Sequence, residues 1–158
     1  MPNLQGSSLL SAWEQAITDG NAAFTSQNDD MAIKYYQDAL KLAQHIISMK
    51  LWLNFIGNRD SDAICIFESS IAALIVTYSN IINLTFRLKQ IPRAMNYFHQ
   101  ARTAILQLLQ DKSLDNKMQN ITERHLYRFL SGSIQLFGTD EEIETWLSSN
   151  LSYSKKLH

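Results

Sequence analysis

The sequence predicts an all-α fold of about five to six helices, and three observations lead to this prediction. Hydrophobic residues make up 46% of the 158-residue chain and recur with helical spacing along nearly all of it. Five glycines and two prolines leave few breaks, which suits long helices and argues against the many turns of a β-sandwich. A stretch after Asp60 keeps its helical period without a break as far as Lys89. We therefore expect a stack or bundle of long helices.

Capping residues and breaks in the apolar spacing set the expected helix boundaries. Ser11 and Glu14 can form a capping box near the start of the first helix, and Gly57 is a plausible stop after the second. Pro92 fits the first turn of the fourth helix. We expect one domain over residues 1–147 and a polar tail over residues 148–158. The expected helices cover approximately residues 8–26, 30–56, 61–89, 92–111 and 113–137, with a short sixth helix from residue 139.

The third predicted helix is the most apolar segment of the chain. Its hydrophobic residues lie on more than one face, which is typical of a helix in the middle of a stack. The uncharged stretch from Ser69 to Phe86 is about as long as the shortest membrane spans. It also contains several serine, threonine and asparagine residues, which disfavour a position in the centre of a bilayer. We therefore expect a buried central helix and no membrane span.

Charge and cysteine content narrow the class of protein. The formal net charge is −1 and the basic residues are scattered, whereas binding to nucleic acid requires clustered lysine and arginine. The single cysteine, Cys65, excludes a disulfide within the chain and favours a reducing compartment. Residues 1–11 lack the basic and apolar regions of a signal peptide. We expect a cytoplasmic protein that does not bind nucleic acid.

No pattern in the sequence indicates a catalytic site, a cofactor or a metal centre. The four histidines are dispersed and form neither a His-x-x-x-His pair nor a Glu-x-x-His element. Cys65 stands between Ile64 and Ile66, which predicts a packed small hydrophobic residue and no nucleophile. No glycine-rich phosphate loop is present. We expect no catalytic residue, no cofactor and no metal ligand.

A pattern of small and aromatic residues occurs twice. Small residues allow two antiparallel helices to approach closely, and the aromatic ring fills the groove between them. The pattern resembles the tetratricopeptide repeat (TPR), closely in the first copy and more weakly in the second, where isoleucine replaces the small residue. The first copy consists of Gly20, Phe24, Ala32, Tyr36 and Ala39, and the second of Ile82, Phe86, Ala94, Phe98 and Ala101.

The distance between the two copies departs from the TPR pattern. Ala32 and Ala94 are 62 residues apart, whereas consecutive repeats of that family are spaced by about 34. The excess amounts to about eight helical turns, which we assign equally to the second and third helices. An elongated middle hairpin then replaces a missing repeat. This layout is also similar to a small family of uncharacterised bacterial TPR-like proteins, a resemblance that implies a fold but no activity.

The TPR resemblance implies a protein- or peptide-binding module, an adaptor or a chaperone-like protein, without catalysis. Some TPR proteins hold the carboxylate of a peptide with lysine and asparagine one turn apart. Ile17 and Ser79 stand where that lysine is needed, so we expect no carboxylate clamp. Asn21, Asn83 and Arg87 remain candidates for binding a peptide on the concave face. The alternative is that these three residues cap helices or face solvent.

A second candidate surface is the tip of the long middle hairpin. Helices of normal repeat length are too short to cover this tip. Either the fifth helix folds over it, or it forms an interface with a partner or a second copy. The alternative function is therefore a structural homodimer, and a small secretion-type chaperone is a less favoured variant because such proteins keep a regular repeat spacing. The residues of the tip are Met49, Trp52, Phe55, Ile56, Ile64 and Phe67.

Overall fold

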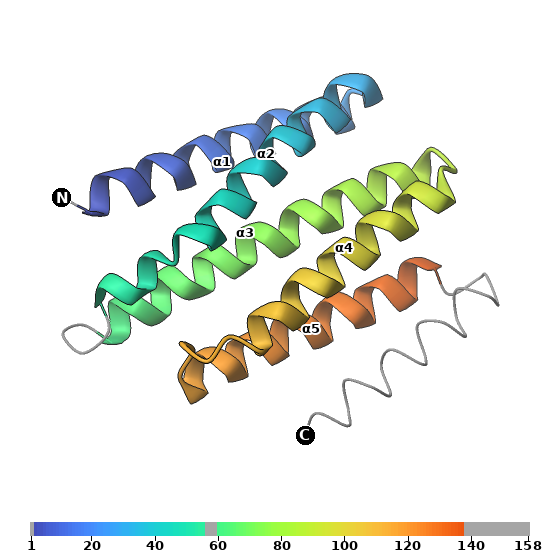
Figure 1. Ribbon diagram of the computed structural model, residues 1–158. Helices are drawn as coiled ribbons and strands as arrows, with labels where there is room; N and C mark the ends of the chain where they lie inside the picture. The colour runs from blue at the N-terminus through green and yellow to red at the C-terminus, as the bar shows by residue number, and fades with distance from the viewer. Residues whose placement is uncertain (1, 56–59, 138–158) are drawn as a thin grey trace. The chain divides into compact units, whose positions relative to one another are not determined.

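The computed structural model describes residues 2–55 and 60–137, and within this part the chain is helical and contains no β-strand (Figure 1). This confirms the predicted all-α fold of about five helices. The sixth helix predicted from residue 139 and the predicted tail lie outside the described residues. The helices are α1 (Pro2–Thr25), α2 (Asp29–Met49), the short 3₁₀ helix η1 (Leu51–Phe55), α3 (Asp60–Arg87), α4 (Ile91–Leu109) and α5 (Asn116–Phe137).

The chain divides into two compact units, residues 1–101 and residues 102–158. The first unit contains α1, α2, η1, α3 and the first half of α4. Within it, α1 and α2 form an antiparallel hairpin. Gly20 near the end of α1 packs on Tyr36, while Gly6 near its start packs on Leu51. The later residue of α1 thus contacts the earlier residue of the following segment, and the earlier residue contacts the later one, so the two segments are antiparallel.

Helices of this unit that follow one another in the chain run in opposite directions (Figure 1). The side chain of Gln44 in α2 donates a hydrogen bond to the hydroxyl of Tyr78 in α3 (3.4 Å). Trp52, later in the chain than Gln44, contacts Phe67, which comes earlier in α3 than Tyr78, so α3 returns along α2. The indole N–H of Trp13 in α1 donates to Thr77 Oγ1 in α3 (2.8 Å), while Phe24, further along α1, contacts Arg87. Helices α1 and α3 are therefore parallel and lie in contact.

The turns that follow α1 and α3 have the same hydrogen bonds. Gln27 and Lys89 adopt left-handed backbone conformations, with φ of 59° and 58°. The backbone hydrogen bonds of both turns match the Schellman motif that often ends a helix. In the first turn the N–H of Gln27 donates to Phe24 O and that of Asn28 to Ala23 O; in the second, the N–H of Lys89 donates to Phe86 O and that of Gln90 to Thr85 O.

The equivalent residues of the two turns are 62 positions apart, the same spacing as between Ala32 and Ala94. The alanines of both copies and the rings of Tyr36 and Phe98 are also buried, since Tyr36 is 2% exposed and Phe98 is completely buried. Phe24 and Phe86 are half-buried. The α1–α2 hairpin and the start of the α3–α4 hairpin are therefore two copies of one structural unit.

Helix α1 begins earlier than the sequence predicts. It starts at Pro2, so Ser11 lies inside the helix and the predicted capping box with Glu14 is wrong. A proline is tolerated in the first helical turn, where its missing N–H has no intrahelical partner. Gly6 then allows the additional turns of α1 to pass close to the side chain of Leu51. Helix α1 therefore reaches the tip of the long hairpin.

Helix α2 ends earlier than predicted. It stops at Met49, and Lys50 takes a left-handed conformation (φ 46°, ψ 47°) that redirects the chain into η1. The predicted continuous helix to Ile56 is therefore wrong. Glycine is the usual residue in this conformation, because any other residue there costs about 1–2 kcal/mol. Here a lysine adopts it, so no glycine in the sequence marks the break. Burial of Trp52 against Phe67, directly after the break, offsets that cost.

Helix α3 is a single uninterrupted rod, as predicted. Its buried serine and threonine hydroxyls donate within the helix: Ser70, Thr77 and Thr85 each bond a carbonyl oxygen four residues earlier. Among the described helices, Ser61–Arg87 alone has the length and apolar composition of a membrane span, and somewhat less than half of that stretch is buried. The core helix of a soluble protein can have the same length and composition.

The second unit contains the end of α4 and helix α5. The carboxylate of Asp111 accepts hydrogen bonds from the N–H and the hydroxyl of Ser113, which holds the turn between the helices. Asp115 then accepts a bond from the N–H of Met118 (2.8 Å) and caps α5. Helix α5 therefore begins at Asn116, slightly later than predicted, and its buried stripe includes Leu126 and Phe129.

Candidate functional site

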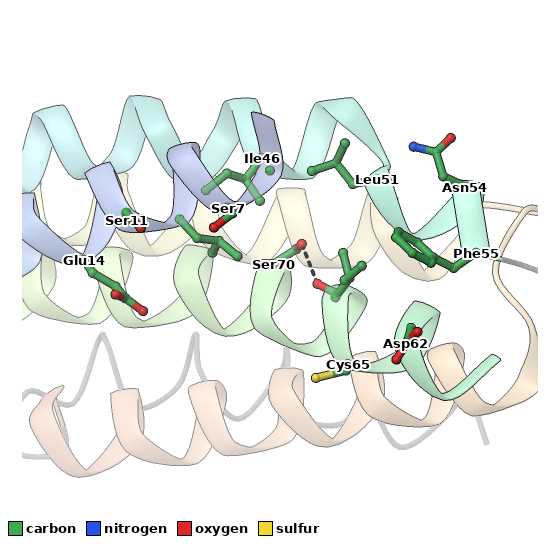
Figure 2. A pocket seen from close by; sticks show the side chains of 13 residues that line it. Ser7, Ser11, Glu14, Ile46, Leu51, Asn54, Phe55, Asp62, Cys65 and Ser70 are labelled. Atoms are coloured by element: carbon green, nitrogen blue, oxygen red, sulfur yellow. Dashed lines mark hydrogen bonds between the residues drawn. The ribbon is translucent and has the colours of Figure 1, made fainter. Parts of the chain in front are cut away.

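An open cavity of about 580 Å³ lies in the first unit, between the N-terminal halves of α1 and α3 (Figure 2). The end of α2 and helix η1 form its third wall. We call it the α1–α3 cavity. Its lining is mostly apolar, with a few hydroxyls, one amide, one thiol and two carboxylates. The lining residues are Gly6, Ser7, Leu10, Ser11, Glu14, Ile46, Leu51, Asn54, Phe55, Asp62, Cys65, Ile66 and Ser70.

Small side chains explain why the two helices leave this space. Where α1 and α3 meet, large or hydrogen-bonding residues such as Trp13 and Thr77 join them. Towards the tip, α1 presents Ser7 and Ser11, and α3 presents Ser70, whose hydroxyl bonds Ile66 O (2.7 Å) on its own helix. These three small side chains therefore leave part of the space between the helices unfilled. The prediction missed this cavity because it started the first helix too late.

The charged residues of the lining are both acidic. Glu14 and Asp62 lie towards opposite ends of the α1–α3 cavity, as Figure 2 shows, and the lining residues within 2–55 and 60–137 include no lysine, arginine or histidine. Cys65 lies near Asp62 and is exposed, so the prediction of a packed cysteine is wrong. It is the only cysteine in the chain. The cavity thus offers an apolar surface between two negative charges and a unique thiol at its edge.

Two of the three residues predicted to bind a peptide have partners within the chain. Asn21 Oδ1 accepts hydrogen bonds from the hydroxyl of Tyr36 (2.8 Å) and from Asn80 Nδ2 (3.3 Å). Arg87 pairs with Asp29, and its guanidinium lies 3.7 Å from the centroid of the Phe24 ring.

The third residue, Asn83, is exposed on α3, one turn before Arg87. None of the three lines the α1–α3 cavity. Asn21 and Arg87 instead join α1, α2 and α3 to one another.

The predicted tip surface is partly buried in the structure. Trp52 and Phe67 are completely buried and contact each other edge to face, with ring centroids 5.0 Å apart. The prediction that they form an exposed interface is therefore wrong, because η1 turns Trp52 inward and α1 extends to the tip. Met49, Phe55 and Ile64 are half-buried, and Phe55 lines the α1–α3 cavity. Ile56 lies outside the described residues.

Two tyrosines between the helices have raised pKa values. Burial raises the pKa of Tyr36 above 10.0, and the positive charge of Arg87 partly opposes this. Burial also raises the pKa of Tyr78, against the hydrogen bond from Gln44 and with a further contribution from Tyr97. In both cases the folded protein favours the neutral phenol.

Because of these two tyrosines, we expect the free energy of unfolding to fall in alkaline solution. In the unfolded chain a tyrosine ionises near pH 10.0, whereas in the folded protein it holds its proton to higher pH. The stabilisation is complete below pH 10 and is lost as the pH rises towards the folded-state pKa. Urea unfolding at about pH 9 and about pH 11 measures the loss, which should be smaller in Tyr78→Phe than in the wild type.

The matched control for this experiment is Tyr127→Phe, because Tyr127 is 51% exposed on α5. It should show the same alkaline loss of stability as the wild type. An equal alkaline loss of stability in the wild type and both variants would contradict the contribution of Tyr78 to that loss.

Potential metal ligands do not converge in the described part of the chain. Within residues 2–55 and 60–137, no group of three or more His, Cys, Asp or Glu side chains is arranged to hold a metal ion. The described histidines remain dispersed, on α2, α4 and α5. The α1–α3 cavity is therefore the candidate site that the geometry supports best.

Comparison with known proteins places the chain in a family. The model of a family described as "Protein of unknown function (DUF2753)" matches residues 11–134. The match covers both copies of the hairpin turn and most of the lining of the α1–α3 cavity. No curated protein and no solved structure matches the chain. Since the family match extends over far more than half of the sequence, the chain belongs to the DUF2753 family.

Proposed function

We propose that this protein is a cytoplasmic protein- or peptide-binding module built from TPR-like hairpins, and that it catalyses no reaction. The repeated turn carries the proposal: the hydrogen bonds of Gln27 and Asn28 recur at Lys89 and Gln90. Stacked copies of a helical hairpin, each contacting its neighbour, are the construction of the repeat proteins that bind other proteins.

The stacking of the two hairpins supports a binding face on α1 and α3. The first helix of each hairpin lies parallel to the other, joined by the bond from Trp13 to Thr77. The second helices are also linked, since Gln37 in α2 donates to the hydroxyl of Tyr97 in α4 (3.2 Å). The face formed by α1 and α3 carries exposed Asn83 and the α1–α3 cavity. An open apolar cavity on such a face is a common feature of binding sites.

Photo-crosslinking in the native host tests this proposal. A photoreactive amino acid is placed at Asn83 or at Ser11, both exposed on the α1–α3 face. The matched control position is Lys41 on α2, whose side chain is 81% exposed. We expect Asn83 or Ser11 to give a defined heterologous adduct that Lys41 does not give. Mass spectrometry identifies the adduct.

Two outcomes would contradict the proposal. A folded protein that gives no adduct at either position on the α1–α3 face would argue against a binding module. An adduct with a second copy of the chain would favour the alternative, a structural homodimer. That alternative now has less support, because Trp52 and Phe67 of the predicted tip interface are used inside the protein.

A further inference from the structure

We propose that the α1–α3 cavity binds a short amphipathic helix that carries basic residues near both ends of its apolar face. This inference rests on the proposed function and specifies the partner's chemistry and the place where it binds. It differs from the concave-face site predicted at Asn21, Asn83 and Arg87, since none of these residues lines the cavity.

The apolar part of the lining selects the apolar face of the partner. Leu10 from α1, Ile66 from α3 and Phe55 from η1 belong to three different elements and line one open space. Walls made of helices offer no unpaired strand edge to an extended peptide. They suit a helix whose apolar residues recur every three to four positions.

The two carboxylates select the charge of the partner and its length. Because Trp13 bonds Thr77, neighbouring Glu14 stands level with the middle of α3, whereas Asp62 lies in its first turn. At 1.5 Å per residue, Glu14 and Asp62 are roughly 20 Å apart along the helix axis. That distance matches about four turns of a bound helix and exceeds the length of a compact small molecule. Lysine or arginine near each end would complement the two charges.

Glu14 is the better residue for testing the charge. It is exposed, whereas Asp62 is partly buried and also has an interaction within the chain. Ser11 is the better residue for testing the cavity itself. It is exposed on α1 and lines the cavity, so a tryptophan in its place fills the space without entering the protein core.

The probe is a fluorescein-labelled peptide of about 14 residues, made of leucine and lysine with the leucines at helical spacing. A peptide with glutamate in place of lysine tests the charge, and a leucine–lysine peptide of scrambled order tests the apolar face. Fluorescence anisotropy measures the Kd of each. We expect the leucine–lysine helix to bind at least about tenfold more tightly than either control peptide, with weaker binding at high salt.

Variants of the protein locate the binding. Ser11→Trp should weaken the binding of the leucine–lysine helix by about tenfold or more. Glu14→Lys should weaken it by about three- to tenfold, as expected for reversal of one exposed charge. The matched control is Ser48→Trp, at an exposed position of α2 outside the cavity, which should change Kd by less than about twofold.

The thiol of Cys65 gives a second readout. Because Cys65 lines the cavity and is the only cysteine, the bound leucine–lysine helix should slow its reaction with a thiol reagent. The control protein carries Cys65→Ser and Lys41→Cys, and its labelling rate should not change.

Equal binding of the lysine and glutamate peptides, full binding by Ser11→Trp, or unprotected Cys65 would overturn the proposal. If Asn83 still gives a heterologous adduct in the host, the proposed function stands and this inference alone is wrong.

Discussion

Replacing Trp52 with alanine is expected to lower the free energy of unfolding by about 3–5 kcal/mol, the usual cost of truncating a buried aromatic side chain. Trp52 is completely buried and packs edge to face on Phe67, which is also completely buried. Its removal leaves a large hole between η1 and α3. Urea unfolding followed by far-UV circular dichroism measures the change.

The neighbouring residue provides a matched control. Leu53 follows Trp52 in η1 but is 40% exposed. Leu53→Ala should therefore cost less than about 1 kcal/mol, because little apolar surface is lost from the interior. Equal effects of the two substitutions would mean that Trp52 is not buried and would restore the prediction of an exposed tip.

The tryptophan also allows a finer test. Its indole N–H has no hydrogen-bond partner among residues 2–55 and 60–137, an unfavourable arrangement for a buried donor. Trp52→Phe removes that donor and keeps an aromatic ring against Phe67. We expect it to cost clearly less than Trp52→Ala in the same unfolding assay. A cost as large as that of alanine would indicate that the N–H makes a necessary hydrogen bond.

Placing isoleucine at Gly20 is expected to lower the free energy of unfolding by about 3 kcal/mol, at the upper end of the usual cost of overpacking. A Cβ atom at Gly20 would lie 2.5 Å from Tyr36 Cε1 and 2.6 Å from Cδ1. The ring of Tyr36 cannot move aside easily, because it is 2% exposed and its hydroxyl is bonded to Asn21. Isoleucine is the residue that the second hairpin carries at the equivalent position, Ile82.

Alanine substitutions at two glycines make a matched pair. Gly20→Ala gains up to about 1 kcal/mol of helix propensity but loses more through the clash with Tyr36, so we expect a net loss of about 1–2 kcal/mol. Gly132 lies inside α5, and a Cβ atom there meets no heavy atom of the described residues within 4 Å. Gly132→Ala should therefore stabilise the protein by about 0.5–1 kcal/mol. Changes of the same sign would contradict the close packing of Gly20 on Tyr36.

The sequence by itself determined the class of the fold and the repeated unit. Helical spacing of apolar residues persists because each amphipathic helix must bury one face, whatever its neighbours are. The alanines and aromatics of the two copies specify close contact between paired helices. Their spacing predicted the relation between Tyr36 and Phe98, both of which are buried in the structure.

Only the tertiary structure decided the tip of the long hairpin and the cavity beside it. Lys50 adopts a left-handed conformation that favours glycine, and it does so because burial of Trp52 against Phe67 follows. Such a break leaves no mark in local sequence preference. Ser11 matches a capping box but lies within α1, since the helix gains further contacts by continuing to Pro2. The α1–α3 cavity depends on the break at Lys50 and on the early start of α1. Contacts between residues far apart in the sequence set both features, whereas local sequence preferences do not.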